Sequence, residues 1–285
     1  AISALMIAAI AVGIGVTTTT LTVWHMMSSN PIEHRNDVLY AVALDNWDPN
    51  QPVDEDHPDH PPALLTYRDA DAIRNSTIPA RSVVMRRGAF TLESTSDRPP
   101  ELVIARLTTK DFFAMFDVPF RYGGGWDAKA DRDGEPSVVL SAKTNEKAFG
   151  GENSVGRTIR LDSREYRVVG VLREWNPTPK FYDPTAGAFA EAEEIYLPYA
   201  RGAMLEVQPE GNVNCWKPEQ IVDFKSFMSS ECVWVQSWVE LPTDADVQRF
   251  QPRQRRRALA GDAQRAFLHR HPADVGAGCA WSGSR

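Results

Sequence analysis

The first 32 residues contain no Asp, Glu, Lys or Arg, and the chain lacks the sequence motifs of several common catalytic classes. A phosphate-binding GxxxxGKS or GxxxxGKT loop is absent, so any ATPase activity would belong to a separate subunit. HExxH and GxSxG are absent as well, which argues against a zincin protease and an α/β-hydrolase. The formal net charge of −7 argues against nucleic acid as a partner, because phosphate binding needs a basic surface.

The uncharged amino-terminal stretch predicts a membrane-spanning helix. Residues 1–24 would form a helix about 36 Å long, against about 30 Å of hydrocarbon in a bilayer. Gly13 and Gly15 suit a span, the threonines at 17–20 can bond carbonyls one turn back, and Trp24 suits the interface. A cleaved signal peptide and a buried soluble helix are weaker alternatives, because a basic flank and a polar face are missing. The chain opens directly in apolar sequence, so we expect the span to be cut at its start.

The middle of the chain predicts a mixed α/β, or α+β, domain. Short apolar runs predict strands, and turn-forming or helical segments separate them. We expect three parts: a transmembrane helix at 1–27, the domain at 28–248, and an Arg-rich tail at 249–285. The expected strands are residues 38–44, 82–85, 101–107, 137–140, 194–199 and 232–241, with a hairpin of 159–161 and 166–172 around Asp162-Ser163-Arg164.

Three polar residues are predicted to begin helices of this domain. Thr66 and Thr108 are each followed three residues later by Asp, which is a capping-box-like pattern. Ser141 is the third expected cap, and Gly150-Gly151 is expected to end its helix.

Cysteine is scarce, with three residues in all. A disulfide between Cys215 and Cys232 would contribute about 3 kcal/mol by the loop-entropy estimate. Disulfides persist outside the cytoplasm, which agrees with a domain exported behind a membrane span. Two buried free thiols are the alternative, and Cys279 is left over in the tail.

Two polar segments contain metal-binding residue types but lack a complete set of ligands. His57, Asp59 and His60 lie in HPDHPP, and imidazole and carboxylate groups bind zinc. A third or fourth ligand is not evident, so we expect no specific site there.

The second polar segment contains Asp127, Asp131, Asp133 and Gly134. It fails as an EF-hand loop, because its glycine and the following Pro136 fall at the wrong positions. We expect it to form an exposed acidic turn, and we expect Gly123-Gly124-Gly125 to be a flexible joint. We therefore predict no catalytic, cofactor-binding or metal-binding residue.

The order of several segments carries a family resemblance. Behind the apolar stretch come LYAVALDNWDP, LTYRDADAIR, a long segment at 102–172, and EIYLPY. Within 102–172, Phe112 and Phe113 fall where the pattern usually reads dYF, and Phe149-Gly150-Gly151, Val155-Gly156 and Val169-Gly170-Val171 also match. From residue 1 to about 248, this ordered set closely resembles the periplasmic core domain of MacB-like ABC transporter permeases, within the FtsX-like permease group.

The resemblance implies a periplasmic domain placed between the first and second transmembrane helices. Because this sequence shows one apolar stretch, we expect an inner-membrane protein with a single span, and we expect no catalysis and no cofactor of its own. It implies that the domain moves when a separate cytoplasmic ABC ATPase hydrolyses ATP, and that it contacts a periplasmic partner protein or substrate, as in efflux. A homodimer or pseudo-dimer in the lipid membrane would be the working unit.

The sequence departs from the family after the domain. Family permeases usually carry three more spans there, whereas this tail has eight Arg, no Lys and two Asp in 249–285. Such a composition is typical of an out-of-frame reading of GC-rich DNA, so we expect a truncated or frameshifted product with a disordered tail. A genuine basic tail that binds anionic lipid or a partner is the alternative.

Other functions stay open beside the transporter hypothesis. A stand-alone, membrane-tethered binding or chaperone module would be favoured by a cluster of exposed tryptophans. A tethered periplasmic hydrolase would need convergent polar residues in a deep pocket and ranks last. A non-functional permease fragment is the remaining alternative.

Overall fold

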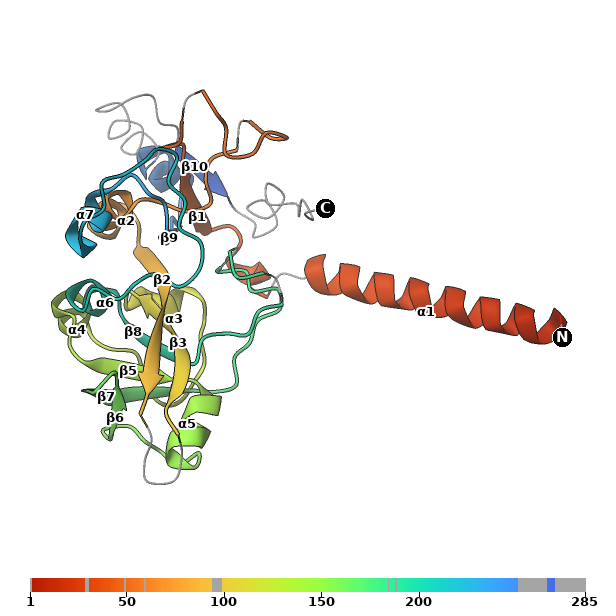
Figure 1. The fold of residues 1–285 in the computed structure, drawn as a ribbon, viewed down its shortest axis with the longest axis horizontal. Coiled ribbons are helices and arrows are strands. Elements are labelled where there is room, and N and C mark those ends of the chain that lie inside the picture. Colours follow the sequence, from red (N-terminus) through yellow and green to blue (C-terminus); the bar gives the residue numbers. More distant parts are fainter. Residues whose placement is uncertain are drawn as a thin grey trace.

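The computed structural model describes residues 2–28, 31–48, 50–58, 60–93, 99–183, 185–187, 189–250 and 266–269 (Figure 1). Its helices and strands alternate along the chain, as the sequence predicts. In chain order they are α1 (Ile2–Ser28), η1 (Glu33–Arg35), β1 (Leu39–Leu44), α2 (Tyr67–Arg74), β2 (Arg81–Leu92), β3 (Glu101–Thr108), α3 (Asp111–Met115), β4 (Phe120–Gly123), α4 (Ala128–Asp133), β5 (Ser137–Leu140), α5 (Ala142–Phe149), β6 (Thr158–Leu161), β7 (Arg164–Leu172), β8 (Ile195–Pro198), α6 (Tyr199–Met204), α7 (Phe224–Ser229), β9 (Gln236–Glu240) and β10 (Ala266–His269).

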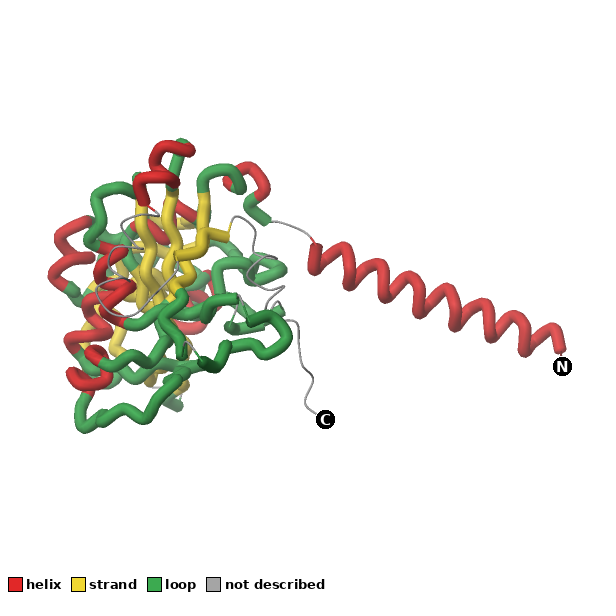
Figure 2. The backbone as a smooth tube through the Cα atoms, turned by 90° about the horizontal axis from the view of Figure 1, so that it is seen from above, coloured by secondary structure: helices red, strands yellow, loops and turns green. Residues whose placement is uncertain are grey.

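The described strands form one mixed sheet, in the order β10-β1-β9-β2-β3-β8-β5-β7-β4, with β6 paired to β2 and β7. Most neighbours are antiparallel, but β3 with β8 and β5 with β7 are parallel. Figure 2 shows several of the short helices lying along one side of this sheet. The predicted mixed α/β fold class is confirmed.

A group of buried aromatic side chains belongs to the same hydrophobic cluster as Ile32 and Leu39, near the start of the domain, and we call this group the aromatic core. Phe112 of α3 is fully buried, and its ring lies 5.1 Å from Phe116, 5.5 Å from Tyr182 and 5.6 Å from Tyr196. Edge-to-face ring contacts of this kind add to the stabilisation from burial alone. The aromatic core comprises Phe112, Phe113, Phe116, Phe181, Tyr182, Tyr196 and Trp238.

Two of the three predicted helix caps are confirmed. The hydroxyl of Thr66 accepts a hydrogen bond from the backbone of Asp69, and Ser141 caps α5 in the same way. Gly150 ends α5 in the left-handed conformation, as predicted. Thr108 is not a cap, because it is still paired within β3, and the chain turns only afterwards, so that α3 begins at Asp111.

The acidic segment is a short capped helix rather than an exposed turn. Asp127 accepts a hydrogen bond from Ala130 at the start of α4, and Gly134 ends the helix with φ of 60°. Asp131 accepts hydrogen bonds of 2.8 Å from the indole of Trp126 and from the backbone of Lys110. These carboxylates therefore stabilise a helix and a neighbouring loop.

The glycine triplet is not a flexible joint. Gly123 lies in β4 with φ of +64°, and a Cβ atom there would collide with the carbonyl of Val169. The backbone of Gly124 donates to that same carbonyl at 3.2 Å. These glycines allow β4 to approach β7 closely.

The strand predictions are right in place but not always in length. β2 reaches Leu92 rather than residue 85, because Arg86 and Gly88 interrupt an apolar pattern that the backbone continues. β9 begins at Gln236, and residues 233 and 235 form isolated bridges instead of a continuous strand. The hairpin turn is confirmed, with Asp162 and Ser163 at φ of 47° and 63°.

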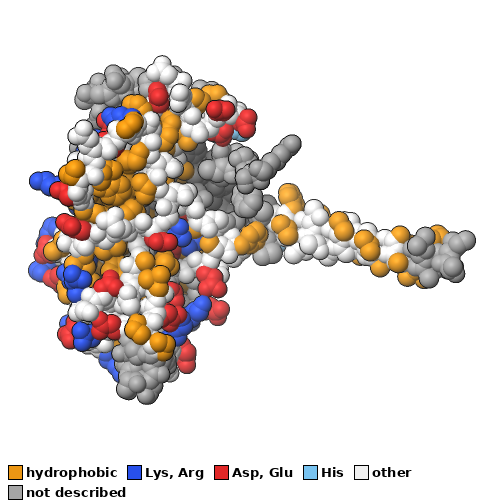
Figure 3. Space-filling view, in the orientation of Figure 1, with side chains coloured by type: hydrophobic (Ala, Val, Ile, Leu, Met, Phe, Trp, Pro, Cys, Tyr) orange, Lys and Arg blue, Asp and Glu red, His pale blue; other side chains and the backbone are white. Residues whose placement is uncertain are grey.

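Helix α1 meets the predicted requirements of a membrane span. Within it, Met6–His25 is long and apolar enough to cross a membrane. The hydroxyls of Thr17 and Thr19 donate to carbonyls four residues back at 2.9 Å, so they expose little hydrogen-bonding capacity. Figure 3 shows apolar side chains along this helix, which projects away from the domain.

In the tail, β10 pairs antiparallel with β1, opposite Ala41–Leu44. These four residues add an edge strand to the sheet, in contrast to the expected disordered tail. The rest of 251–285, Cys279 included, lies outside the described residues. The frameshift hypothesis and the proposed domain boundaries stay predictions.

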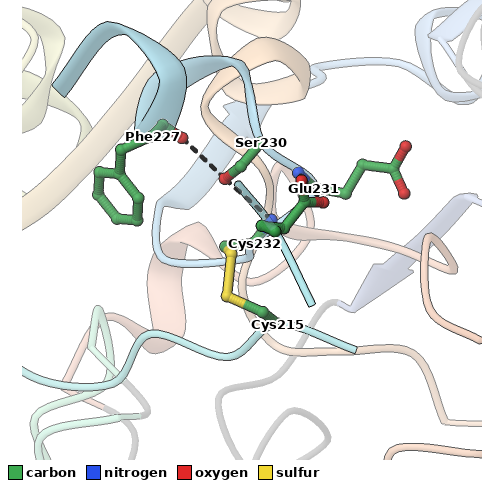
Figure 4. Close-up of a disulfide and its surroundings, with 6 residues drawn as sticks. Cys215, Phe227, Ser230, Glu231 and Cys232 are labelled. Atoms are coloured by element: carbon green, nitrogen blue, oxygen red, sulfur yellow. Dashed lines mark hydrogen bonds between the residues drawn. A yellow bond between two sulfur atoms is a disulfide. The ribbon is translucent and has the colours of Figure 1, made fainter. Parts of the chain in front are cut away.

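A disulfide joins Cys215 to Cys232 across 17 positions of sequence (Figure 4). Cys232 is buried, and the hydroxyl of Ser230 accepts a hydrogen bond from its backbone at 3.3 Å. Next to the disulfide, Asn214 and Val233 form an isolated β-bridge. The disulfide therefore holds the 206–223 loop against the segment that leads into β9.

Removing this disulfide is expected to lower the free energy of unfolding by about 3 kcal/mol, because the unfolded chain regains the entropy of a 17-residue loop. The measurement is urea denaturation of the detergent-solubilised chain, comparing a Cys215→Ser/Cys232→Ser variant with the parent. Cys279→Ser is the matched control and should leave the midpoint unchanged. Equal midpoints for all three proteins would contradict a stabilising disulfide.

Candidate functional site

The segment that links α1 to β1, residues 31–37, forms a joint between the apolar helix and the domain. Ile32 is only 5% exposed and belongs to the same buried cluster as the aromatic core. The side chain thus belongs to the buried cluster that also contains Phe116 and Phe181. Burial of an isoleucine contributes about 1.5–3 kcal/mol, so it anchors the joint to the domain.

Ion pairs surround this apolar anchor. Arg35 approaches Asp117 at 3.6 Å and Glu240 at 3.4 Å, and Glu240 also binds Arg81 at 2.6 Å. His34 contacts the other oxygen of Asp117 at 2.8 Å. The His34 pair is largely exposed and contributes little, whereas Arg35 and Glu240 are mostly shielded from water. The joint is thereby connected to the turn after α3 and to the end of β9.

A buried group of charges contacts the aromatic core through Tyr182, whose hydroxyl donates to Glu193 at 2.9 Å, and we call this group the Arg106 cluster. Arg106 of β3 is fully buried, and its guanidinium lies 2.5 Å from carboxylate oxygens of both Asp183 and Glu193. It also donates to Gln236 of β9 at 3.0 Å. Lys180 completes the cluster, with its ammonium 2.7 Å from Glu193.

Electrostatic effects keep these groups charged despite their burial. Burial alone would raise the pKa of Asp183 and of Glu193, but the nearby Arg106 outweighs it and holds both below their ordinary values. Burial lowers the pKa of Lys180. For Arg106, burial opposes the charge, but the two carboxylates outweigh it and raise the pKa.

The Arg106 cluster fastens the loop 173–194 to the sheet. Lys180, Asp183 and Glu193 all come from this loop, while Arg106 and Gln236 come from strands. Phe181 and Tyr182 of the same loop enter the aromatic core, where Ile32 also lies. The joint and the cluster are therefore connected through one buried core.

Sequence reasoning assigned no role to these residues. Arg106 was the available signal, since it stands alone within the apolar run of an expected strand. Its partners are 77 to 130 positions away in sequence, and only the fold brings them together.

A second buried arginine, Arg86, has no carboxylate partner among the residues that the structure describes. Burial lowers the pKa of Arg86 to about 10, so the group stays charged at neutral pH. Its guanidinium lies 5.2 Å from the ring centre of Trp234, a cation–π arrangement. Trp126 and Trp238 are buried like Trp234, so these three tryptophans do not form the exposed cluster that a stand-alone binding module would favour.

The structure brings together two of the three histidine-segment residues that the sequence singled out. His57 and His60 lie ring against ring, and Asp54 is beside them, while Asp59 is outside the described residues. Asp127, Asp131, Asp133 and Gly134 form α4 and its caps.

The mixed α/β domain thus follows an apolar helix that is long enough to cross a membrane. The sequence matches the family of MacB-like periplasmic core domains over residues 3–255, and the chain belongs to that family. This is a family of periplasmic domains of ABC-type transporter permeases. The resemblance inferred from the motif order is confirmed.

The fold resembles that of a solved periplasmic domain, and two further solved structures are similar at lower scores. The periplasmic region of MacB from Actinobacillus actinomycetemcomitans has a TM-score of 0.52 at 11% identity, covering 90% of this chain and 100% of that one. A permease domain from Porphyromonas gingivalis has a TM-score of 0.49 at 13% identity, covering 82% and 91%. The extracellular domain of the noncanonic ABC-type transporter YknZ from Gram-positive bacteria has 0.47 at 14%, covering 80% and 99%. No curated protein matches the sequence.

Proposed function

We propose that this chain is the membrane-anchored periplasmic part of an inner-membrane ABC transporter permease. It transmits the movement of a separate cytoplasmic ATPase to a periplasmic substrate or partner protein, and it performs no bond chemistry of its own. The observation that supports this proposal is the joint, because Ile32 and Arg35, which follow the apolar helix within a few residues, are held in the domain by burial and by ion pairs.

A mechanical role follows from the stiffness of this connection. Displacement of α1 acts on the aromatic core through Ile32, and the same core contacts the loop 173–194, which the Arg106 cluster holds on the sheet. A packed core transmits displacement rather than absorbing it. Motion at the membrane would therefore reach the sheet and the loop together.

Co-purification tests the partner directly. The chain is solubilised in detergent from its native membrane, and the proteins that accompany it are identified by mass spectrometry. Recovery of an ATP-binding subunit in near-stoichiometric amount supports the permease function. Recovery of the chain alone contradicts it and favours a stand-alone tethered module.

The rigidity of the joint makes a second prediction. With spin labels at Val23 of α1 and Glu165 of β7, in a Cys279→Ser background, we expect a narrow distance distribution by electron–electron double resonance. An Ile32→Ala/Arg35→Ala variant should broaden it, because both the buried anchor and the ion pairs are lost.

The control removes an exposed ion pair far from the joint. Arg160 and Glu93 approach at 3.1 Å on the neighbouring strands, and an Arg160→Ala/Glu93→Ala variant should keep the narrow distribution. Equal widths for the parent and the Ile32→Ala/Arg35→Ala variant would contradict a stiff joint.

A further inference from the structure

Three metal-binding side chains meet in the loop between β1 and α2. Asp54, His57 and His60 each offer a ligand atom, and these atoms all lie within 4.8 Å of one another. The imidazole Nδ1 of His57 is 3.1 Å from a carboxylate oxygen of Asp54. The two imidazole rings are stacked, with centres 4.9 Å apart and planes 6° from parallel.

The spacing is close to that of a bound zinc ion. Zinc binds imidazole nitrogen and carboxylate oxygen at about 2.0–2.1 Å in a tetrahedral arrangement, which places neighbouring ligand atoms about 3.3 Å apart. The His57–Asp54 contact already has this separation. Small rotations of the side chains would bring the largest separation, 4.8 Å, into the same range.

The backbone of the loop holds the three residues in one turn. The backbone of Asp56 donates to the carboxylate of Asp54 at 2.9 Å, and the backbone of His60 donates to the carbonyl of His57 at 3.0 Å. Pro58, Pro61 and Pro62 restrict the chain further, so less conformational entropy is lost when a metal binds. Figure 1 shows this loop beside β1 and β10, at one end of the domain.

We propose that Asp54, His57 and His60 bind one divalent transition metal ion of the zinc type. Three protein ligands leave one tetrahedral position for water or for a group of a partner. Two imidazoles favour zinc, nickel or copper over magnesium and calcium, which prefer oxygen ligands only. The carboxylate beside His57 is that of Asp54, while Asp59 of the sequence-based set lies outside the described residues.

The test is isothermal titration of the full-length, detergent-solubilised chain with zinc chloride in a non-chelating buffer. A Cys279→Ser background removes the free thiol, and the histidines of the tail are kept in every variant. We expect one site per chain with micromolar affinity, and no heat of binding with magnesium chloride. A His57→Ala/His60→Ala variant should bind at least about tenfold more weakly.

Matched variants separate this site from adventitious binding. His34 is an exposed histidine that also contacts a carboxylate, and His34→Ala should leave the affinity unchanged. Asp54→Asn should weaken binding, whereas Asp59→Asn should not. Circular dichroism verifies that each variant is folded. Equal affinity in the parent and the His57→Ala/His60→Ala variant, or an absence of zinc binding in the parent, would overturn the proposal.

Discussion

Arg106→Met is expected to lower the free energy of unfolding by about 3–5 kcal/mol, the cost typical of removing one partner from a buried ion pair. Asp183 and Glu193 would keep their negative charge in a site from which water is excluded. Lys180 still faces Glu193 at 2.7 Å, and Arg87 still approaches Asp183, but at 3.8 Å rather than 2.5 Å, so the remaining cations offset only part of the loss. Urea denaturation of the detergent-solubilised chain at pH 7.5 measures the loss.

The free energy of unfolding lost in Arg106→Met should increase as the pH rises from 4 toward neutral. In the parent, the pKa values of Asp183 and Glu193 lie below their unfolded values of about 4, so their contribution is present above pH 4 and is lost in stronger acid. Without Arg106, burial raises the pKa of these carboxyls, and protonation relieves the cost. The difference between parent and Arg106→Met should therefore be largest near neutral pH and shrink toward pH 4.

Arg160→Met is the matched control for the Arg106 experiment. It removes an arginine from an exposed ion pair with Glu93, and such pairs contribute about 0–1 kcal/mol. A loss for Arg106→Met no greater than the control, or a difference that grows toward acid, would contradict the structural assignment.

Phe112→Ala is expected to cost about 3–5 kcal/mol, because it leaves a cavity at the centre of the aromatic core. The ring is fully buried and lies within 6.0 Å of the rings of Trp175, Tyr182 and Tyr196. Phe112→Leu fills most of the cavity and should cost clearly less. Thermal and urea denaturation of the same three proteins measure the series.

Phe189→Ala provides the control, since that ring is 54% exposed in the loop 173–194. We expect its midpoint to match the parent within about 0.5 kcal/mol, as for most surface substitutions. If Phe112→Ala cost as little as Phe189→Ala, the aromatic core would not be the support of the joint.

Local patterns predicted local structure well. Thr66 and Ser141 were identified as caps because a hydroxyl satisfies backbone donors of the first helical turn, and Asp162-Ser163 was identified because polar residues tolerate positive φ. Thr108 carries the same cap pattern as Thr66, yet pairing with β2 keeps it in a strand. A cap motif indicates that a helix can begin at a residue, but pairing with a neighbouring strand can keep that residue in a strand instead.

Long-range contacts account for what sequence reasoning missed. The partners of Arg106 come from a loop and a strand that are distant in sequence, and neither Asp183 nor Gln236 belongs to a recognisable motif. The contact between Asp54 and His57 was missed for a different reason, because the sequence does not show how this one turn folds.

The amino-acid sequence by itself determined the apolar helix, the mixed α/β class and the family, because each depends on composition, periodicity or the order of local motifs. Only the tertiary structure decided the strand order, the anchoring of Ile32 and the composition of the Arg106 cluster. These features depend on contacts between segments far apart in the chain. The free energy of such contacts comes from burial and charge pairing that no single segment contains.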